Sequence, residues 1–167
     1  MKIAEALDMK GRLTIQKFNP YGQLIDAIKA NNFIVYTGRD LVAQLFLGQP
    51  IGRIQYIAVG TGTERVKPIE DKSLRQEVFR KEIKPDPSFS DTEEKEIQTE
   101  NGVVKQKNRR VIVSADLDYG EPDKEYELTE AGLFNAQTGG IMYNRVVFPR
   151  ITKTKDFKLT LLWEIIF

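Results

Sequence analysis

Carboxylates are the side chains of this sequence best suited to catalysis, because it contains neither cysteine nor histidine. Thiol nucleophiles, disulfides and the imidazole that most acid–base enzymes use near neutral pH are therefore ruled out. Acidic residues gather at 93–100 and again at 116–130. A glycoside hydrolase needs two carboxyl groups facing each other about 5 to 9.5 Å apart, one with a raised pKa, and no pattern here fixes such a pair. We interpret both stretches as solvated strand faces and turns, which makes a carboxylate-dependent glycan hydrolase the least favoured function.

Two patterns could bind a metal or a cofactor. Asp116, Asp118 and Asp123 lie close together, but the D-x-[DN]-x-[DN]-G-x5-E pattern of a calcium loop is not met. In VGTGTERVKP, Gly60 and Gly62 could form a phosphate loop, but that loop needs a lysine beside its last glycine and a following helix. The G-x-G-x-x-G spacing of a dinucleotide site is not met either. We therefore expect no metal and no cofactor, and interpret both glycines as residues that shape a turn.

Basic residues form one short cluster, which consists of Lys105, Lys107, Arg109 and Arg110. Nearby glutamates offset its charge, and it lacks the interleaved aromatic residues of single-strand binding surfaces. The 25 basic and 24 acidic residues leave a net charge of +1, so the chain as a whole does not attract nucleic acid. We expect a solvated strand face and no nucleic-acid partner.

Alternating apolar residues predict strands through most of the chain. These strands are expected at 11–18, 53–59, 110–118, 126–134, 141–148 and 157–167. Helical spacing predicts two short helices, at 21–30 and 40–47. The last strand places Trp163 on its apolar face, so the end of the chain should lie in a sheet that buries it. Strands joined by turns, with no helix after residue 60, indicate a mainly β (α+β) protein: an antiparallel β-sandwich or barrel-like domain with short N-terminal helices.

Composition divides the chain into two regions. We expect residues 1–50 to form an N-terminal arm and helical docking element, and residues 51–167 to form an antiparallel β domain. A charged excursion interrupts the β domain at about 64–110. Within it, Asn101 and Gly102 predict a type I′ turn at the tip of a projecting polar hairpin. Later bends and turns are expected at three further glycines, which are Gly132, Gly139 and Gly140.

Apolar residues of the first 50 positions are the predicted assembly surface, because two short helices expose more apolar positions than a small sheet face covers. The residues are Ile3, Leu7, Leu24, Ile28, Leu41, Leu45 and Phe46. An alternative is a carbohydrate-binding β-sandwich, a receptor-binding module that would contact a cell-surface glycan through Phe89, Tyr119 and Tyr143. No apolar run approaches the roughly 18 residues that a membrane span needs, so no span is expected.

Four segments together resemble a known group of proteins. They are IAVGTGT at 57–63, LRQEVFR at 74–80, LTEAGLFNAQTGGIMYNRVVF at 128–148 and the closing WEIIF. This pattern, which covers residues 53–167, is similar to small structural proteins of the bacteriophage tail, including tail-fibre and baseplate-associated components, and of contractile injection systems. The resemblance implies a structural virion component, or its counterpart in a phage-tail-like particle, that catalyses nothing. It also implies a homo-oligomer or an assembly with other tail proteins, formed in the bacterial cytoplasm and located in the fibre, baseplate or cap region.

Overall fold

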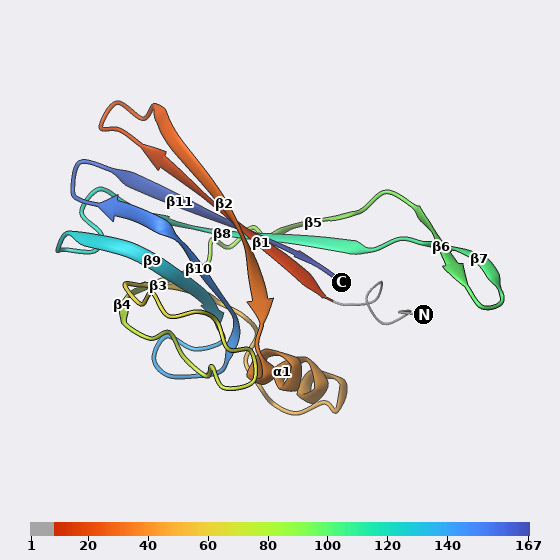
Figure 1. Ribbon diagram of the computed structural model, residues 1–167. Helices are drawn as coiled ribbons and strands as arrows, with labels where there is room; N and C mark the ends of the chain where they lie inside the picture. Colours follow the sequence, from red (N-terminus) through yellow and green to blue (C-terminus); the bar gives the residue numbers. More distant parts are fainter. Residues whose placement is uncertain (1–8) are drawn as a thin grey trace.

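The chain forms a curled antiparallel β-sheet with one helix beside it (Figure 1). The computed structural model describes residues 9–167. Nine strands are hydrogen-bonded in the order β4-β3-β9-β10-β2-β1-β11-β8-β5, and β6 pairs with β7 as a separate ribbon. The expected antiparallel, barrel-like class is confirmed, in the form of a half-barrel.

The elements have the following bounds. The strands up to the separate ribbon are β1 Lys10–Phe18, β2 Leu24–Ile34, β3 Tyr56–Gly60, β4 Glu77–Glu82, β5 Ser88–Asp91, β6 Lys95–Thr99 and β7 Gly102–Gln106. The later strands are β8 Arg109–Leu117, β9 Tyr126–Phe134, β10 Met142–Lys153 and β11 Lys158–Ile166. The helix α1 spans Tyr36–Phe46.

Strand β2 joins the two halves of the curled sheet. It pairs with β1 along most of its length, but at its end Phe33 and Ile34 pair with β10. The sheet folds over at this point, so that β1, β11 and β8 face β10, β9 and β3 across a shared apolar core. Alternate residues of β11 fill this core, and Trp163 has no exposed surface, as the pattern of the last strand predicted.

The connection between β4 and β5 draws the other side of the half-barrel together. Ile83 donates a backbone hydrogen bond to the Gln55 carbonyl, and Lys84 donates one to the Ser114 carbonyl of β8. This short segment therefore links the two layers at the side opposite to β2. The core is covered at both sides, although the sheet itself does not close.

The helix predicted at 21–30 is wrong, because this segment forms most of β2. The spacing of Leu24 and Ile28 suits a helix, but Ile28 lies opposite the buried Ile15 in the register with β1. A tight turn precedes the strand, in which the Asn19 side chain accepts backbone hydrogen bonds and Gly22 takes a φ of 74°. That turn reverses the chain and makes the segment pair with β1, so residues 10–34 belong to the β-sheet.

The second predicted helix is present and starts earlier, as α1. Its first turn lies directly against β10, where the Thr37 hydroxyl donates to the Met142 carbonyl at 2.7 Å. A Cβ added to Gly38 would lie 1.9 Å from the Tyr143 carbonyl oxygen, so only glycine allows this close approach. Gly48, with a φ of 67°, follows the end of the helix, where glycine readily adopts positive φ.

Candidate functional site

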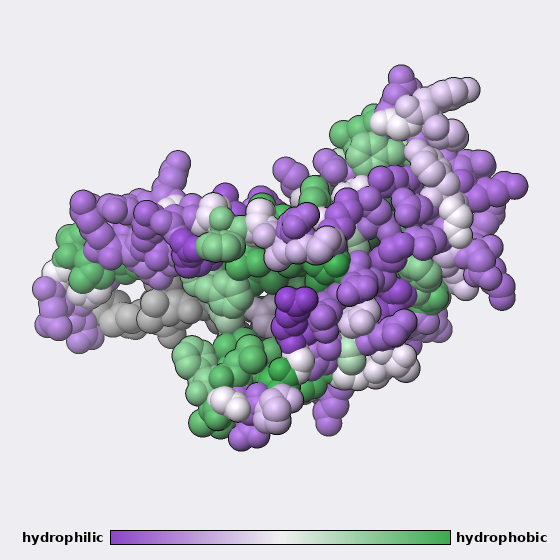
Figure 2. All heavy atoms as spheres, turned by 180° about the vertical axis from the view of Figure 1, so that it is seen from behind, coloured by the Kyte–Doolittle hydropathy of each residue, from purple (hydrophilic) through white to green (hydrophobic). Residues whose placement is uncertain are grey.

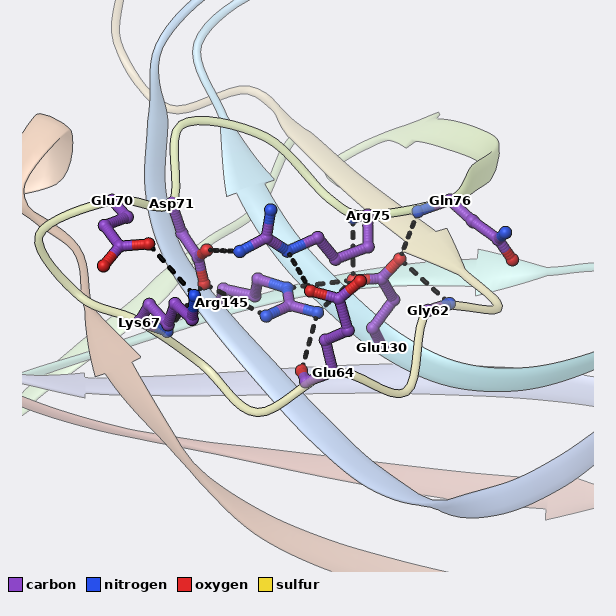
Figure 3. A network of polar contacts seen from close by, with 9 residues as sticks. All are labelled: Gly62, Glu64, Lys67, Glu70, Asp71, Arg75, Gln76, Glu130 and Arg145. Atoms are coloured by element: carbon purple, nitrogen blue, oxygen red, sulfur yellow. Dashed lines mark hydrogen bonds and ion pairs between the residues drawn. The ribbon is translucent and has the colours of Figure 1, made fainter.

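Three charged side chains from distant parts of the sequence meet inside the protein (Figure 3). Glu130 lies on β9, Arg145 on the neighbouring β10, and Asp71 on the loop between β3 and β4. The Nε and Nη2 atoms of Arg145 lie 2.9 and 2.8 Å from Oε2 of Glu130, and its Nη1 lies 3.0 Å from Oδ2 of Asp71. The three side chains have no exposed surface. Because an unpaired buried charge is costly, each of them requires the others, and we call this triad the clamp.

The clamp also holds the backbone of the loop at 61–76, hereafter the clamped loop. The Glu130 carboxylate accepts hydrogen bonds from the backbone N–H groups of Gly62, Arg75 and Gln76, at 3.1, 3.1 and 2.7 Å. Asp71 accepts one from the Lys67 N–H at 2.9 Å, and Arg145 donates one to the Glu64 carbonyl at 3.1 Å. The loop is thus tied to β9 and β10 along its whole length. These contacts position backbone, which is a structural role.

The glycine pair at the end of β3 is explained by this contact. A Cβ added to Gly62 would lie 2.5 Å from Oε1 of Glu130 and 2.6 Å from the Arg75 Cβ. A Cβ added to Gly60 would lie 2.4 Å from the Gln76 carbonyl oxygen. Such distances are shorter than real carbon atoms tolerate, so only glycine gives the buried carboxylate access to the loop backbone.

The interpretation of Glu130 as a solvated carboxylate is wrong. It lies within the apolar run LTEAGLF, and Arg145 lies within YNRVVF on the strand that follows. A single charge in each of these two apolar runs, of opposite sign, was the available signal for a buried pair. Asp71 gave no such signal, because it lies in a charged segment whose fold is decided by its distant partners.

Asp116 and Glu121, which lie outside the clamp, have lowered pKa values. Burial acts to raise the pKa of Asp116, but hydrogen bonds from two lysines and Thr160 outweigh it and lower the pKa. A hydrogen bond from Lys81 lowers the pKa of Glu121. A general acid needs a raised pKa, so neither carboxyl group suits that role. Within residues 9–167, no three acidic side chains converge as metal ligands would.

Lys153 is a fourth buried charge, at the end of β10. Its Nζ donates to the Thr154 carbonyl at 2.8 Å. Burial lowers its pKa, and the charges of Asp118 and Glu121 partly oppose that change. The buried ammonium group thus has a hydrogen-bond partner at the end of β10 and is close enough to the loop after β8 to interact with its acidic residues.

The aromatic residues considered for sugar binding do not form a common platform. The expectation that Tyr143 is exposed is wrong: it is 3% exposed, and burial raises its pKa to about 12. Tyr119 is half-buried, and its hydroxyl donates to the Asn19 carbonyl at 2.7 Å. Phe89 stays largely exposed, with the Arg109 guanidinium 4.6 Å from the centre of its ring.

Four large apolar side chains stand exposed on α1 and just after it. They have exposed fractions of 63, 50, 89 and 75% and are Tyr36, Leu45, Phe46 and Leu47. Figure 2 shows the hydrophobic colour that gathers over α1 on this face of the molecule. Leu45, Phe46 and Leu47 are consecutive at the C-terminal end of the helix, and we call these three residues the helix surface, whereas Tyr36 lies at the first residue of α1. Neither Tyr36 nor Leu47 was among the predicted assembly residues.

The predicted assembly residues are divided between this surface and the core. Leu45 and Phe46 belong to the helix surface, and Leu24 is exposed at the start of β2. Leu41 is 2% exposed and Ile28 packs against the core, so these two do not offer a docking surface. The other two predicted residues lie outside the described part of the chain and are Ile3 and Leu7.

The hairpin at 92–108 projects from the body of the protein, and we call it the arm (Figure 1). Thr99 pairs with Gly102, so Glu100 and Asn101 form its tip. The predicted type I′ turn is wrong, because it requires positive φ at both central residues. Among the described residues only glycines have positive φ, and here it is Gly102, at 114°.

The basic cluster lies at the root of the arm and is paired with carboxylates. Lys107 and Arg109 lie 2.9 and 2.5 Å from Asp91, and Lys105 lies 3.7 Å from Glu94. These exposed pairs neutralise the cluster, which agrees with the interpretation of a solvated strand face.

Within residues 9–167, no helix has the length and apolarity required to cross a membrane. No protein-family model, no curated protein and no solved structure matches this chain.

Proposed function

We propose that this protein is a structural subunit that acts by protein–protein assembly, in a phage tail or phage-tail-like contractile injection particle. Its place there would be the baseplate, tail-fibre or cap region. The observation that supports assembly is the helix surface, where three consecutive large apolar side chains are half or more exposed. Exposed apolar groups that lie together on a soluble domain mark interaction sites more often than chance exposure does.

The helix surface is presented on a rigid support. The opposite side of α1 buries Leu41 and touches the backbone of β10 through Gly38. A surface that is already ordered loses little conformational entropy when a partner covers it. Phe46, which is 89% exposed on the last turn of the helix, has the size and position of a central anchor.

The assignment to a tail-like particle comes from the sequence resemblance at 53–167. The clamp adds a physical reason for the segments that carry it, because IAVGTGT, LRQEVFR and LTEAGLF supply residues that meet in one network. A clamped loop and a closed core make a stiff body, which suits a building block. The catalytic alternative receives no support from Asp116 or Glu121, whose pKa values are lowered.

The test is assembly with the proteins encoded by the adjacent genes, followed by sedimentation and negative-stain microscopy. The unchanged chain should enter large particles, and Phe46→Ser with Leu47→Ser should reduce its incorporation by at least about tenfold. Tyr21→Ser is the matched control, because Tyr21 is equally exposed, at 88%, but lies at the distant β1–β2 turn. A chain that stays monomeric and outside every particle contradicts the proposal.

A further inference from the structure

We propose that copies of this chain join by strand addition, in which β6 of the arm of one copy pairs antiparallel with the free edge of β2 in the next copy. This inference rests on the proposed function, and it names the partner as a second copy of the same chain. Two observations lead to it: an arm without support of its own, and a strand edge without a neighbour.

The arm is a two-stranded ribbon, in which β6 has β7 as its one strand partner among the described residues. A two-stranded hairpin is marginally stable in water unless a third strand or a packed surface supports it. Val103 and Val104 of this arm are 52% and 47% exposed. The arm therefore gains most if another sheet edge covers it.

Strand β2 offers such an edge. Within the part of the chain that the structure describes, its pairing on the side of β10 is limited to Phe33 and Ile34, so its earlier residues pair there with β1 alone. Every second residue there directs its N–H and C=O groups away from β1, which is the template for an added strand. Leu24 and Ile25, which are 53% and 49% exposed, lie on this unpaired part.

The two elements meet only between copies. In the sheet order, β2 is separated from β5 by β1, β11 and β8, and the arm continues from β5 and returns to β8. Figure 1 shows the arm leaving the body on the side opposite to the β1–β2 hairpin. Pairing of the arm of one copy with β2 of another is therefore a head-to-tail contact, which produces a ring when it closes and a filament when it does not.

One antiparallel register matches the side chains on both faces. Within one copy Ile15 lies opposite Ile28, and within the arm Ile97 lies opposite Val104. Placing Ile97 opposite Ile28 therefore joins these two pairs into one apolar row across four strands. On the other face the same register sets Glu96 opposite Lys29. Within the described chain neither of these two exposed charges has an ion-pair partner. Opposite charges directly across a strand pair favour the pairing.

The competing arrangements are less well matched. β7 could instead pair with β2, with Lys105 opposite Asp26 and Val103 opposite Ile28. The next residue in that row would be the polar Gln98, because it lies opposite Val103 within the arm. A two-fold β2–β2 contact would set Ala27 opposite itself or Ile28 opposite itself, which leaves the arms uncovered. Of these arrangements, the β6 register alone both continues the apolar row and sets opposite charges across from each other.

Engineered cysteines test the register directly, because the chain has no cysteine of its own. In the proposed register Ala27 lies opposite Gln98, and both are exposed. Opposite residues in a strand pair have the Cα separation that a disulfide requires. Ala27→Cys and Gln98→Cys chains, mixed and oxidised gently, should give at least tenfold more linked dimer than Ala27→Cys mixed with the exposed control Lys155→Cys. Equal yields, linkage of Ala27→Cys to itself, or preferential linkage to Val104→Cys overturns the proposal.

A charge exchange on folded protein provides the second measurement. Lys29→Glu or Glu96→Lys alone should weaken self-association about fivefold in sedimentation velocity, and the two together should restore it. If the double variant is as weak as the single ones, strand addition is wrong. The proposed function is still supported if the charge exchange fails but the unchanged chain forms multimers that Phe46→Ser with Leu47→Ser removes. A purified chain that is monomeric at every concentration contradicts strand addition, and it contradicts the proposed function as well when the chain also stays outside every particle.

Discussion

The clamped loop and the arm belong to one charged stretch of sequence, but the loop is packed against the sheet and the arm is exposed. The clamped loop buries Val66, Asp71 and Leu74 and is tied to β9 and β10 through the clamp. The arm exposes both of its valines, and within residues 9–167 its strands β6 and β7 pair with each other and with no other strand. Charge density therefore does not predict exposure here. The deciding factor is whether a buried partner exists elsewhere in the chain, and Arg145 supplies one only to the loop.

The largest expected effect comes from removing the centre of the clamp. Arg145→Met leaves the Glu130 carboxylate buried without a cation and leaves Asp71 with the partly exposed Arg75 as its cation, which should lower the free energy of unfolding by about 3 to 5 kcal/mol. Urea unfolding followed by tryptophan fluorescence measures this change. Arg150→Met, on the same strand and 71% exposed, is the control and should cost less than about 1 kcal/mol. Equal losses for the two variants would show that the clamp does not stabilise the loop.

A smaller loss is expected when the approach of Glu130 to the loop is obstructed. The Cβ of Gly62→Ala would lie 2.5 Å from the Glu130 carboxylate, so that the loop or the carboxylate must shift. We expect a loss of about 1 to 3 kcal/mol in the free energy of unfolding, as for an overpacked core. Gly120→Ala has no atom within 4 Å of its added carbon and should change stability little. Proteolysis within 61–76 should also become faster in Gly62→Ala than in the control.

Removal of the arm should matter less than either change to the clamp. Replacing residues 95–106 by a short glycine-rich turn should alter the free energy of unfolding by less than about 1 kcal/mol, because the ribbon adds no surface to the core. Hydrogen exchange should show rapid exchange of the arm amides and slow exchange in β9 and β11. A loss as large as that of Arg145→Met would mean that the arm supports the fold, against the contrast drawn here.

The smallest effect is expected at the root of the arm, in the titration of Asp91. Hydrogen bonds from Lys107 and then from Arg109 lower the pKa of this fully exposed carboxyl group. A lowered pKa in the folded state gives stability above the unfolded pKa, and that stability disappears as the pH falls through the lowered value. Carboxyl NMR titration should show that the pKa rises in Lys107→Gln and rises in the native chain at about 1 M salt. If the pKa of Asp91 stays the same in Lys107→Gln and at high salt, groups other than Lys107 and Arg109 lower it.

Part of this fold could be predicted from local patterns alone. The alternation of β8 and β11, the apolar face of the last strand and the presence of a hairpin near Asn101 all depend on residues close together in sequence, although the predicted turn type was wrong. The segment at 21–30 could not be assigned in this way, because its apolar spacing fits a helix and a strand equally. Pairing with β1, through a turn at Asn19 and Gly22, decided for the strand.

The candidate sites show the same division. Leu45 and Phe46 could be recognised as exposed apolar positions of a short helix, whereas Leu41, one turn earlier, is covered by the body of the protein. Nothing in the local sequence separates these positions, since burial is a property of the neighbours that the fold provides. The glycines of the VGTGT segment could likewise be identified as shaping a turn. Their reason, a buried carboxylate 68 residues away from Gly62, required the tertiary structure.

The sequence by itself determined a β-rich, closely packed domain without cysteine or histidine, because period-two apolar patterns and residue types are local properties. Only the tertiary structure decided which charges are buried and which are solvated. Coulombic pairing and hydrogen bonding act through space, so the placement of Asp71, Glu130 and Arg145 became defined only when β9, β10 and the loop met.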